Sequence, residues 1–107
     1  MMRVGEQHWA TVLHRDGSES VVSVEPLAKY ATNFATSPRT GDRYAGQWTV
    51  EIPSLKTVLT VTAAPTLQQV EGPNGGGVNE AASTVRGTYE GKPVTGVAYV
   101  EQNGNWK

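Results

Sequence analysis

Short β-prone segments, each followed by residues that favour turns, succeed one another along this chain and constrain its fold more than any other feature. In the first pair of segments, successive residues of 7–14 fall on opposite faces of a strand, and Trp9 is on one of these faces. The second segment, residues 21–24, is rich in valine. Asp16-Gly17 lies between them. Because glycine readily adopts the positive φ of a tight turn, this pattern predicts a β-hairpin.

Two further hairpins are predicted in the same way. Their strands either alternate between polar and apolar residues or are rich in β-branched residues, and turn residues separate them. The pairs are 47–52 with 58–63 around Pro53-Ser54, and 81–89 with 93–102 around Glu90-Gly91.

The remaining residues are predicted to be mostly loop. The alternation stops over residues 26–45, where residues 27–31 have room for one helical turn at most and residues 37–42 have the composition of a surface loop. Residues 68–71 are predicted as a short strand, and the glycine-rich residues 72–77 as a flexible connection or a lid. That stretch lacks the Lys-Ser/Thr pair and the helix of a phosphate-binding loop.

The whole pattern predicts one all-β domain. A chain of 107 residues is near the usual size of a single domain, and none of its segments shows helical periodicity. Six firm strands and a short seventh, joined by turns, predict an antiparallel meander that closes into a β-barrel or packs as two sheets.

Composition excludes several classes of function. Nine Lys and Arg residues are scattered singly against ten Asp and Glu residues, which argues against a nucleic-acid partner. With no apolar run of about 18 residues and no charged leader, we expect neither a membrane span nor a signal peptide. The chain as given is therefore expected in the cytoplasm, or outside the cell if it is an excised domain. The absence of cysteine excludes disulfides, zinc ribbons and thiol catalysis.

No metal or cofactor site is expected. His8 and His14 share a strand face but are separated by about 20 Å at the rise of a β-strand, so they cannot bind one metal ion together. No Gly-x-Ser-x-Gly elbow is present to support a Ser-His-Asp triad. Any chemistry would come from carboxylates, phenols and amides in an apolar cavity.

Four blocks of sequence, taken in order, resemble the C-terminal half of the lipocalin-like hydratase family. The blocks are Thr36–Tyr44, Trp48–Pro53, Leu59–Thr62 and Gly91–Glu101. That family includes carotenoid 1,2-hydratase (hydroxyneurosporene synthase), kievitone hydratase and related fungal cyclases that catalyse Diels-Alder reactions. The resemblance extends over about residues 12–104.

The resemblance implies that residues 1–107 form a lipocalin-like β-barrel, built from consecutive antiparallel hairpins, that packs against a second, N-terminal lipocalin-like domain. It also implies an apolar ligand of terpenoid or polyketide type, and hydration or cyclisation of that ligand without a cofactor. The chain departs from the family pattern where Val78-Asn79-Glu80-Ala81 replaces Tyr-Trp-Glu-Gly and where Gln68-Gln69 replaces Gln-Glu. These departures weaken a direct transfer of hydratase chemistry.

Glu101, Glu80 and Tyr99 are the candidate catalytic residues. Both glutamates fall on glutamates of the family pattern, and Tyr99 shares a strand face with Glu101 because side chains repeat with a period of two. A carboxyl or phenol buried in an apolar cavity can donate a proton to an alkene or polarise a carbonyl. The alternative is structural: solvated or ion-paired glutamates and a core tyrosine with one hydrogen bond.

Trp48, Trp9 and Tyr89 are the candidate ligand-binding aromatic residues, since they could stack on a flat polyene or polyketide, and the amides Gln69 and Asn79 complete the set. The three aromatic residues are equally explained as core residues that contact no ligand. We favour this interpretation for Trp48, because it belongs to the apolar face of its predicted strand.

A competing hypothesis makes the chain a non-catalytic binding or dimerisation module, either half of a two-barrel protein or a homodimer. The amides at Gln69 and Asn79 favour it. An exposed Trp9 or Trp106 beside a sheet edge would favour it as well, because open edges and apolar patches attract partners.

Overall fold

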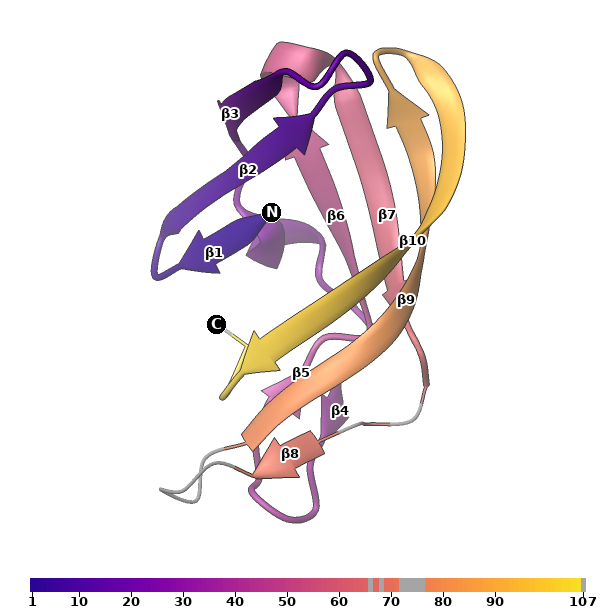
Figure 1. Cartoon of the computed structure of the whole chain (residues 1–107). Helices are drawn as coiled ribbons and strands as arrows, with labels where there is room; N and C mark the ends of the chain where they lie inside the picture. Colours follow the sequence, from indigo (N-terminus) through magenta and orange to yellow (C-terminus); the bar gives the residue numbers. More distant parts are fainter. Residues whose placement is uncertain (66, 68, 72–76, 107) are drawn as a thin grey trace.

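The computed structural model describes residues 1–65, 67, 69–71 and 77–106 and consists mostly of β-strands (Figure 1). In chain order the elements are β1 (Met2–Val4), β2 (Gln7–Leu13), β3 (Glu19–Ser23), η1 (Leu27–Tyr30), β4 (Ala35–Thr36), β5 (Arg43–Tyr44), β6 (Gln47–Ile52), η2 (Pro53–Leu55), β7 (Thr57–Ala63), β8 (Gln69–Glu71), β9 (Gly77–Tyr89) and β10 (Lys92–Asn103). Within this part of the chain the helical elements are short 3-10 turns, and none is long and apolar enough to cross a membrane.

The main sheet is antiparallel and has the strand order β10-β9-β7-β6. β8 also belongs to it, because the first residues of β9 pair with β8 while its later residues pair with β7. Figure 1 shows that β9 and β10 bend together across the molecule, so that the sheet curls into a half-barrel. The prediction of an all-β, antiparallel fold is thus confirmed. The main sheet is a curled half-barrel.

All three predicted hairpins are present. β2 pairs with β3, β6 with β7, and β9 with β10. The last hairpin turns on Glu90 and Gly91, whose φ angles of 50° and 78° are both positive. Two successive positive φ angles define the type I′ turn, whose twist matches that of the two strands. The local turn chemistry therefore sets the register of the longest hairpin.

The N-terminal sheet has the order β1-β2-β3. Its first strand, β1, lies outside the predicted hairpins and pairs Met2 with Trp9 and Arg3 with His8. After β3, the Glu25 N–H donates to the Glu51 carbonyl of β6 over 2.9 Å. This bond attaches the N-terminal sheet to the half-barrel. Among the described strands, β1 pairs only with β2 and β10 only with β9.

The segment between β3 and β6 confirms the predicted break in the pattern. Residues 27–30 form the single helical turn η1, and residues 37–42 form the loop between the two-residue strands β4 and β5. Of the predicted short strand at 68–71, residues 69–71 form β8, and residue 68 lies outside the described residues. Residues 72–76, most of the predicted glycine-rich connection, lie outside the described residues.

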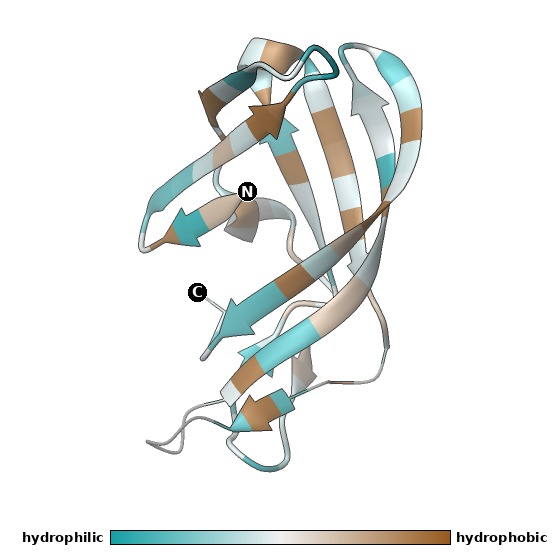
Figure 2. Cartoon of the chain, in the orientation of Figure 1, coloured by the Kyte–Doolittle hydropathy of each residue, from teal (hydrophilic) through white to brown (hydrophobic). Residues whose placement is uncertain are grey.

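Buried apolar side chains on the concave face of the half-barrel form the core. Trp48, Val50 and Ile52 are buried and alternate with less buried residues along β6. Figure 2 shows the same alternation as brown bands between paler ones on β6 and β7. Ala10 from β2 and Leu27 from η1 pack into the same cluster. The N-terminal sheet and the half-barrel therefore share one core.

Candidate functional site

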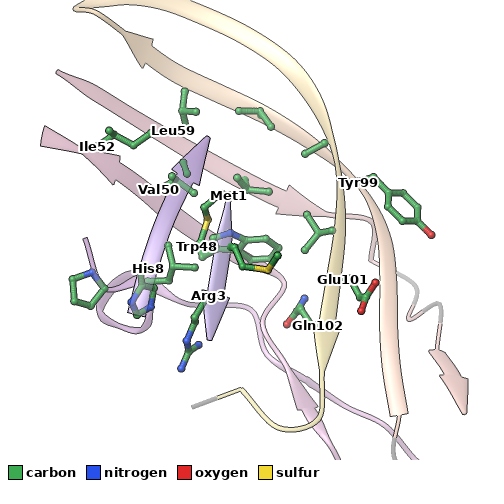
Figure 3. A pocket seen from close by; sticks show the side chains of 18 of the residues that line it. Met1, Arg3, His8, Trp48, Val50, Ile52, Leu59, Tyr99, Glu101 and Gln102 are labelled. Atoms are coloured by element: carbon green, nitrogen blue, oxygen red, sulfur yellow. The ribbon is translucent and has the colours of Figure 1, made fainter. Parts of the chain in front are cut away.

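A cavity of about 1600 Å³ lies between the N-terminal sheet and the concave face of the half-barrel (Figure 3). Residues of β1 and β2 line one side of it, and residues of β6, β7, β9 and β10 line the other. Its volume exceeds that of the usual small-molecule pocket, which is about 300 to 1,000 Å³.

The wall on the half-barrel side is mainly apolar. Trp48 and Val50 project from β6, Val61 from β7, and Val85 from β9. These side chains share the concave face because residues two apart on a strand point the same way. A ligand in contact with this wall would bury apolar surface, which is favourable by about 25 cal/mol per Å² removed from water.

One end of the cavity is polar, where β1 and β2 approach the segment after β10. Arg3 and His8 are cross-strand partners on the cavity side, and Trp106 follows β10. The Arg3 guanidinium carbon lies 5.1 Å from the centre of the Trp106 ring, a cation–π contact. The rings of Trp106 and Trp48 are 5.8 Å apart, which connects this end to the apolar wall.

These three residues are absent from the predicted site. A usable signal is present for His8, which alternates with Trp9 and shares its strand face with Ala10 and Val12. That face lines the cavity. For Arg3 and Trp106 the sequence offers no such signal, because their proximity depends on the unpredicted strand β1 and on the path of the chain after β10.

Tyr99, Glu80 and Glu101 do come together, but on the outer face of the β9–β10 hairpin. The Tyr99 hydroxyl donates to Glu80 Oε2 over 2.6 Å, and Glu101 is the direct cross-strand partner of Glu80. This hydrogen bond raises the pKa of Tyr99 above its ordinary value. Tyr99 and Glu101 border the cavity at β10, but Figure 3 shows their side chains pointing away from Trp48 and Val50.

The exposure of this group limits what it can do chemically. Tyr99 is 71% exposed, whereas the structural alternative for it was a buried core tyrosine. Water surrounds the pair, so burial contributes little to the strength of its hydrogen bond or to its acidity. Tyr99 shares its face with Glu101 as predicted but is hydrogen-bonded to Glu80, and the pair lacks the apolar surroundings that acid catalysis on an alkene requires.

The predicted ligand-binding residues separate into three places. Trp48 and Tyr89 line the cavity. Trp9 is half-buried on the opposite face of β2 from His8 and Ala10. Gln69 and Asn79 are cross-strand partners on β8 and β9 and do not line the cavity, although Asn79 also pairs with the lining residue Gln102 of β10. Trp48 is also part of the buried core, as the structural reading of this residue predicts.

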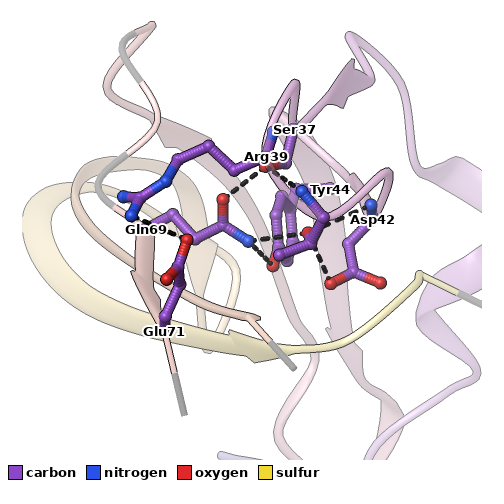
Figure 4. A network of polar contacts seen from close by, with 7 residues as sticks. Ser37, Arg39, Asp42, Tyr44, Gln69 and Glu71 are labelled. Carbon is purple, nitrogen blue, oxygen red and sulfur yellow. Dashed lines mark hydrogen bonds and ion pairs between the residues drawn. The ribbon is translucent and has the colours of Figure 1, made fainter. Parts of the chain in front are cut away.

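Gln69 belongs to a network of polar contacts that fastens the β4–β5 loop to β8 (Figure 4). Its Oε1 accepts a hydrogen bond from the Ser37 hydroxyl, and its Nε2 donates to Thr40 Oγ1 over 2.9 Å and to the Tyr44 hydroxyl over 3.1 Å. Burial raises the pKa of Tyr44. Because the Gln69 amide already has protein partners at both ends, its role here is structural.

A buried amide, Gln102, holds β10 against the segment after β5. Its Oε1 accepts from the Ala45 N–H and its Nε2 donates to the Ala45 carbonyl, both over 3.0 Å. Two reciprocal bonds to one residue fix the position of β10, the strand that forms one border of the cavity. In the sequence Gln102 is only the last residue of the predicted strand 93–102.

The structure suggests no metal centre among the described residues, where no three His, Cys, Asp or Glu side chains lie close enough to hold an ion. His14 Nε2 is hydrogen-bonded to Ser20 Oγ over 2.8 Å, and His8 Nδ1 lies 3.1 Å from the Glu6 carbonyl.

Comparisons of the chain with protein-family models, with curated proteins and with solved structures found no match. The resemblance to lipocalin-like hydratases therefore remains a prediction from the four sequence blocks.

Proposed function

We propose that this chain binds an apolar small molecule in the cavity between its N-terminal sheet and its half-barrel. The observation that carries the proposal is the size of that cavity, about 1600 Å³, together with its wall of Trp48, Val50, Val61 and Val85. Cavities of this kind, mostly apolar with a few polar groups at one end, are the usual form of a ligand site. The terpenoid or polyketide class of the ligand rests on the sequence resemblance alone.

A lipocalin-like barrel is the finer form of the fold that we propose. Two features support it: the hairpins follow one another along the chain, and the main sheet is antiparallel and curled around the cavity. In such a barrel β1 and β10 would be neighbours. These are the strands that each pair with a single strand among those described.

Assistance of hydration or cyclisation is the part of the predicted function that the geometry supports least. It needs a proton donor or a hydrogen-bond donor inside the apolar cavity. The Tyr99–Glu80 pair is on the outer face of the hairpin. Binding, with or without later chemistry, is therefore the function proposed.

Titration with flat polyenes, followed by tryptophan fluorescence, tests this function, because Trp48 and Trp106 line the cavity. Ala98→Phe fills space on the cavity side of β10, whereas Val97→Phe adds the same ring one residue away on the outer face, where Val97 is 88% exposed. We expect Ala98→Phe to weaken binding at least tenfold and Val97→Phe to leave it within about twofold, since a blocked cavity loses the ligand's buried contacts. Absence of quenching by every polyene, or equal effects of the two variants, would contradict the proposal.

A second candidate function is homodimerisation through β10. The observation that favours it is the exposed outer face of this edge strand, where Val97 is 88% and Tyr99 71% exposed. Edge strands with exposed apolar residues pair readily with a second chain. Sedimentation velocity should then show a dimer for the natural chain and a monomer for Val97→Lys, and a natural chain that stays monomeric at every concentration would refute this candidate.

A further inference from the structure

The polar end of the cavity carries a permanent positive charge. Arg3 is the only lysine or arginine among the described residues that line the cavity. It is half-buried, and Figure 3 shows its side chain beside His8, at the end of the cavity away from Ile52 and Leu59. Because a guanidinium does not lose its proton in proteins, this charge is present at every pH at which the chain is folded.

The Arg3 guanidinium is positioned by aromatic residues of the cavity. Its central carbon lies over the Trp106 ring, 5.1 Å from the ring centre, and the Trp106 ring is in turn 5.8 Å from that of Trp48. Trp106 is also held through its backbone N–H, which donates to the Arg43 carbonyl over 2.8 Å. A contact over an aromatic ring is compatible with hydrogen bonds from the N–H groups in the guanidinium plane. The charge is therefore held where the polar end meets the apolar wall.

Two carboxylates also belong to the described lining of the cavity, those of Glu6 and Glu101. The Glu101 side chain points away from the apolar wall (Figure 3), and its Oε1 accepts a hydrogen bond from Asn103 Nδ2 over 3.0 Å. Glu6 lies in the turn between β1 and β2 and is exposed. Water and salt screen an exposed charge more than a half-buried one, so Arg3 has the stronger effect on a molecule inside the cavity.

We propose that the apolar ligand of this cavity is an acid, whose carboxylate binds the Arg3 guanidinium at the polar end while its apolar part lies against Trp48 and Val50. This inference rests on the proposed binding function and goes beyond it by naming the head group. A carboxylate accepts two parallel N–H bonds from one guanidinium, because the two planar groups have matching geometry. A cationic head group would be repelled, and a neutral one would gain no attraction between charges.

Three eight-carbon probes share an apolar chain and differ in their head groups. At neutral pH octanoate is an anion, octanol is neutral and octylammonium is a cation. By calorimetric titration we expect the natural chain to bind octanoate about tenfold more tightly than octylammonium. The ratio of the octanol Kd to the octanoate Kd is then compared between variants, because the different hydration of the two head groups cancels in that comparison.

A variant of Arg3 localises the effect. Arg3→Met removes the charge and keeps an unbranched side chain that can pack on Trp106. We expect it to lower the Kd ratio about tenfold, the low end for hydrogen bonds to a charged group, since Arg3 is only half-buried. Arg43→Met is the matched control, because the Arg43 guanidinium also lies over an aromatic ring, 3.6 Å from the centre of Phe34, but Arg43 does not line the cavity. It should change the ratio by less than about twofold.

Salt dependence tests the same contact in the natural chain, without any variant that has to fold. Raising the salt concentration from about 0.1 M to about 1 M shortens the screening length from about 10 Å to about 3 Å. The Kd ratio should then fall about threefold, because salt weakens the attraction between Arg3 and octanoate and leaves octanol without such a contact. A ratio that is independent of salt would contradict the inference.

The outcomes distinguish this inference from the function on which it rests. If none of the three probes binds, the proposed binding function fails and the inference fails with it. If octanol binds but Arg3→Met leaves the Kd ratio as Arg43→Met does, the cavity binds apolar molecules and the acid inference is wrong. Binding of octylammonium as tight as that of octanoate also overturns it, because the Arg3 charge would then not select the head group.

Discussion

Replacement of Gln102 by leucine tests whether one buried amide holds β10 in place beside the cavity. The side chain makes two 3.0 Å hydrogen bonds to the backbone of Ala45, which is itself 2% exposed. Leucine has a similar size and no polar atom, so Gln102→Leu would leave the Ala45 N–H and carbonyl buried without partners.

The expected cost follows from these two groups. An unpaired buried backbone group costs about 1 to 3 kcal/mol, so the two together cost about 2 to 6 kcal/mol. The apolar side chain of leucine recovers about 1 to 2 kcal/mol by its burial. We therefore expect Gln102→Leu to lower the free energy of unfolding by about 1 to 4 kcal/mol.

Urea denaturation followed by tryptophan fluorescence measures this change. The matched control is Asn103→Ala, because Asn103 is the next residue of β10, is exposed, and bonds only the nearby Glu101 side chain, over 3.0 Å. Its effect should stay within about 0.5 kcal/mol, as for most surface substitutions. If Gln102→Leu proves as mild as this control, the two bonds to Ala45 do not hold the strand and the reasoning is refuted.

Gln102→Glu adds a pH dependence with a definite sign. A protonated carboxyl has the donor and acceptor that the Ala45 backbone requires, whereas a carboxylate faces its carbonyl with negative charge. The folded state should therefore raise the pKa of the new carboxyl above the ordinary value of about 4.3. The stability of Gln102→Glu should be near that of the natural chain below about pH 4 and should fall relative to it as the pH rises toward neutrality. A constant difference across that range would contradict the arrangement.

Two further predictions concern the pairing of β8 with β9 and the outer face of β10. Gly77→Ala should lower the free energy of unfolding by about 1 to 3 kcal/mol, because the added Cβ overlaps the Gln69 amide, and Gly96→Ala, which meets no atom, should have little effect in the same thermal denaturation. Glu80→Gln should lower the pKa of Tyr99 toward its ordinary value, since the hydrogen bond to the Glu80 carboxylate is the largest cause of its upward shift. Ultraviolet titration of the phenol measures this, and an unchanged titration curve would argue against the bond.

The hairpins could be predicted from the sequence because each depends on residues close together in the chain. Alternation sets which side chains share a face of β6, and Asp16-Gly17 and Glu90-Gly91 supply turns whose positive φ angles are seen at Gly17, Glu90 and Gly91. The single turn of η1 and the short strand β8 followed from equally local signals.

The cavity could be predicted only in part. Trp48 and Tyr89, two of the predicted ligand-binding residues, line it. The choice of Trp9 over His8 depended on which face of β2 meets the half-barrel, and alternation defines two faces without saying which one is covered. The period of two correctly puts Tyr99 and Glu101 on one face, but the hydrogen bond of Tyr99 to Glu80 across the hairpin and the exposure of this face were not predicted.

The sequence by itself determined that this chain forms antiparallel hairpins, because turn chemistry and the period of two act over a few residues. Only the tertiary structure decided that the main sheet curls without continuous pairing from β10 to β1, and that Arg3, His8 and Trp106 meet at one end of a cavity. Those contacts join the two ends of the chain, and their geometry depends on the accumulated twist and bend of every strand between them. Local sequence patterns do not predict the accumulated twist and bend, so the position of the polar end of the cavity could be seen only in the folded structure.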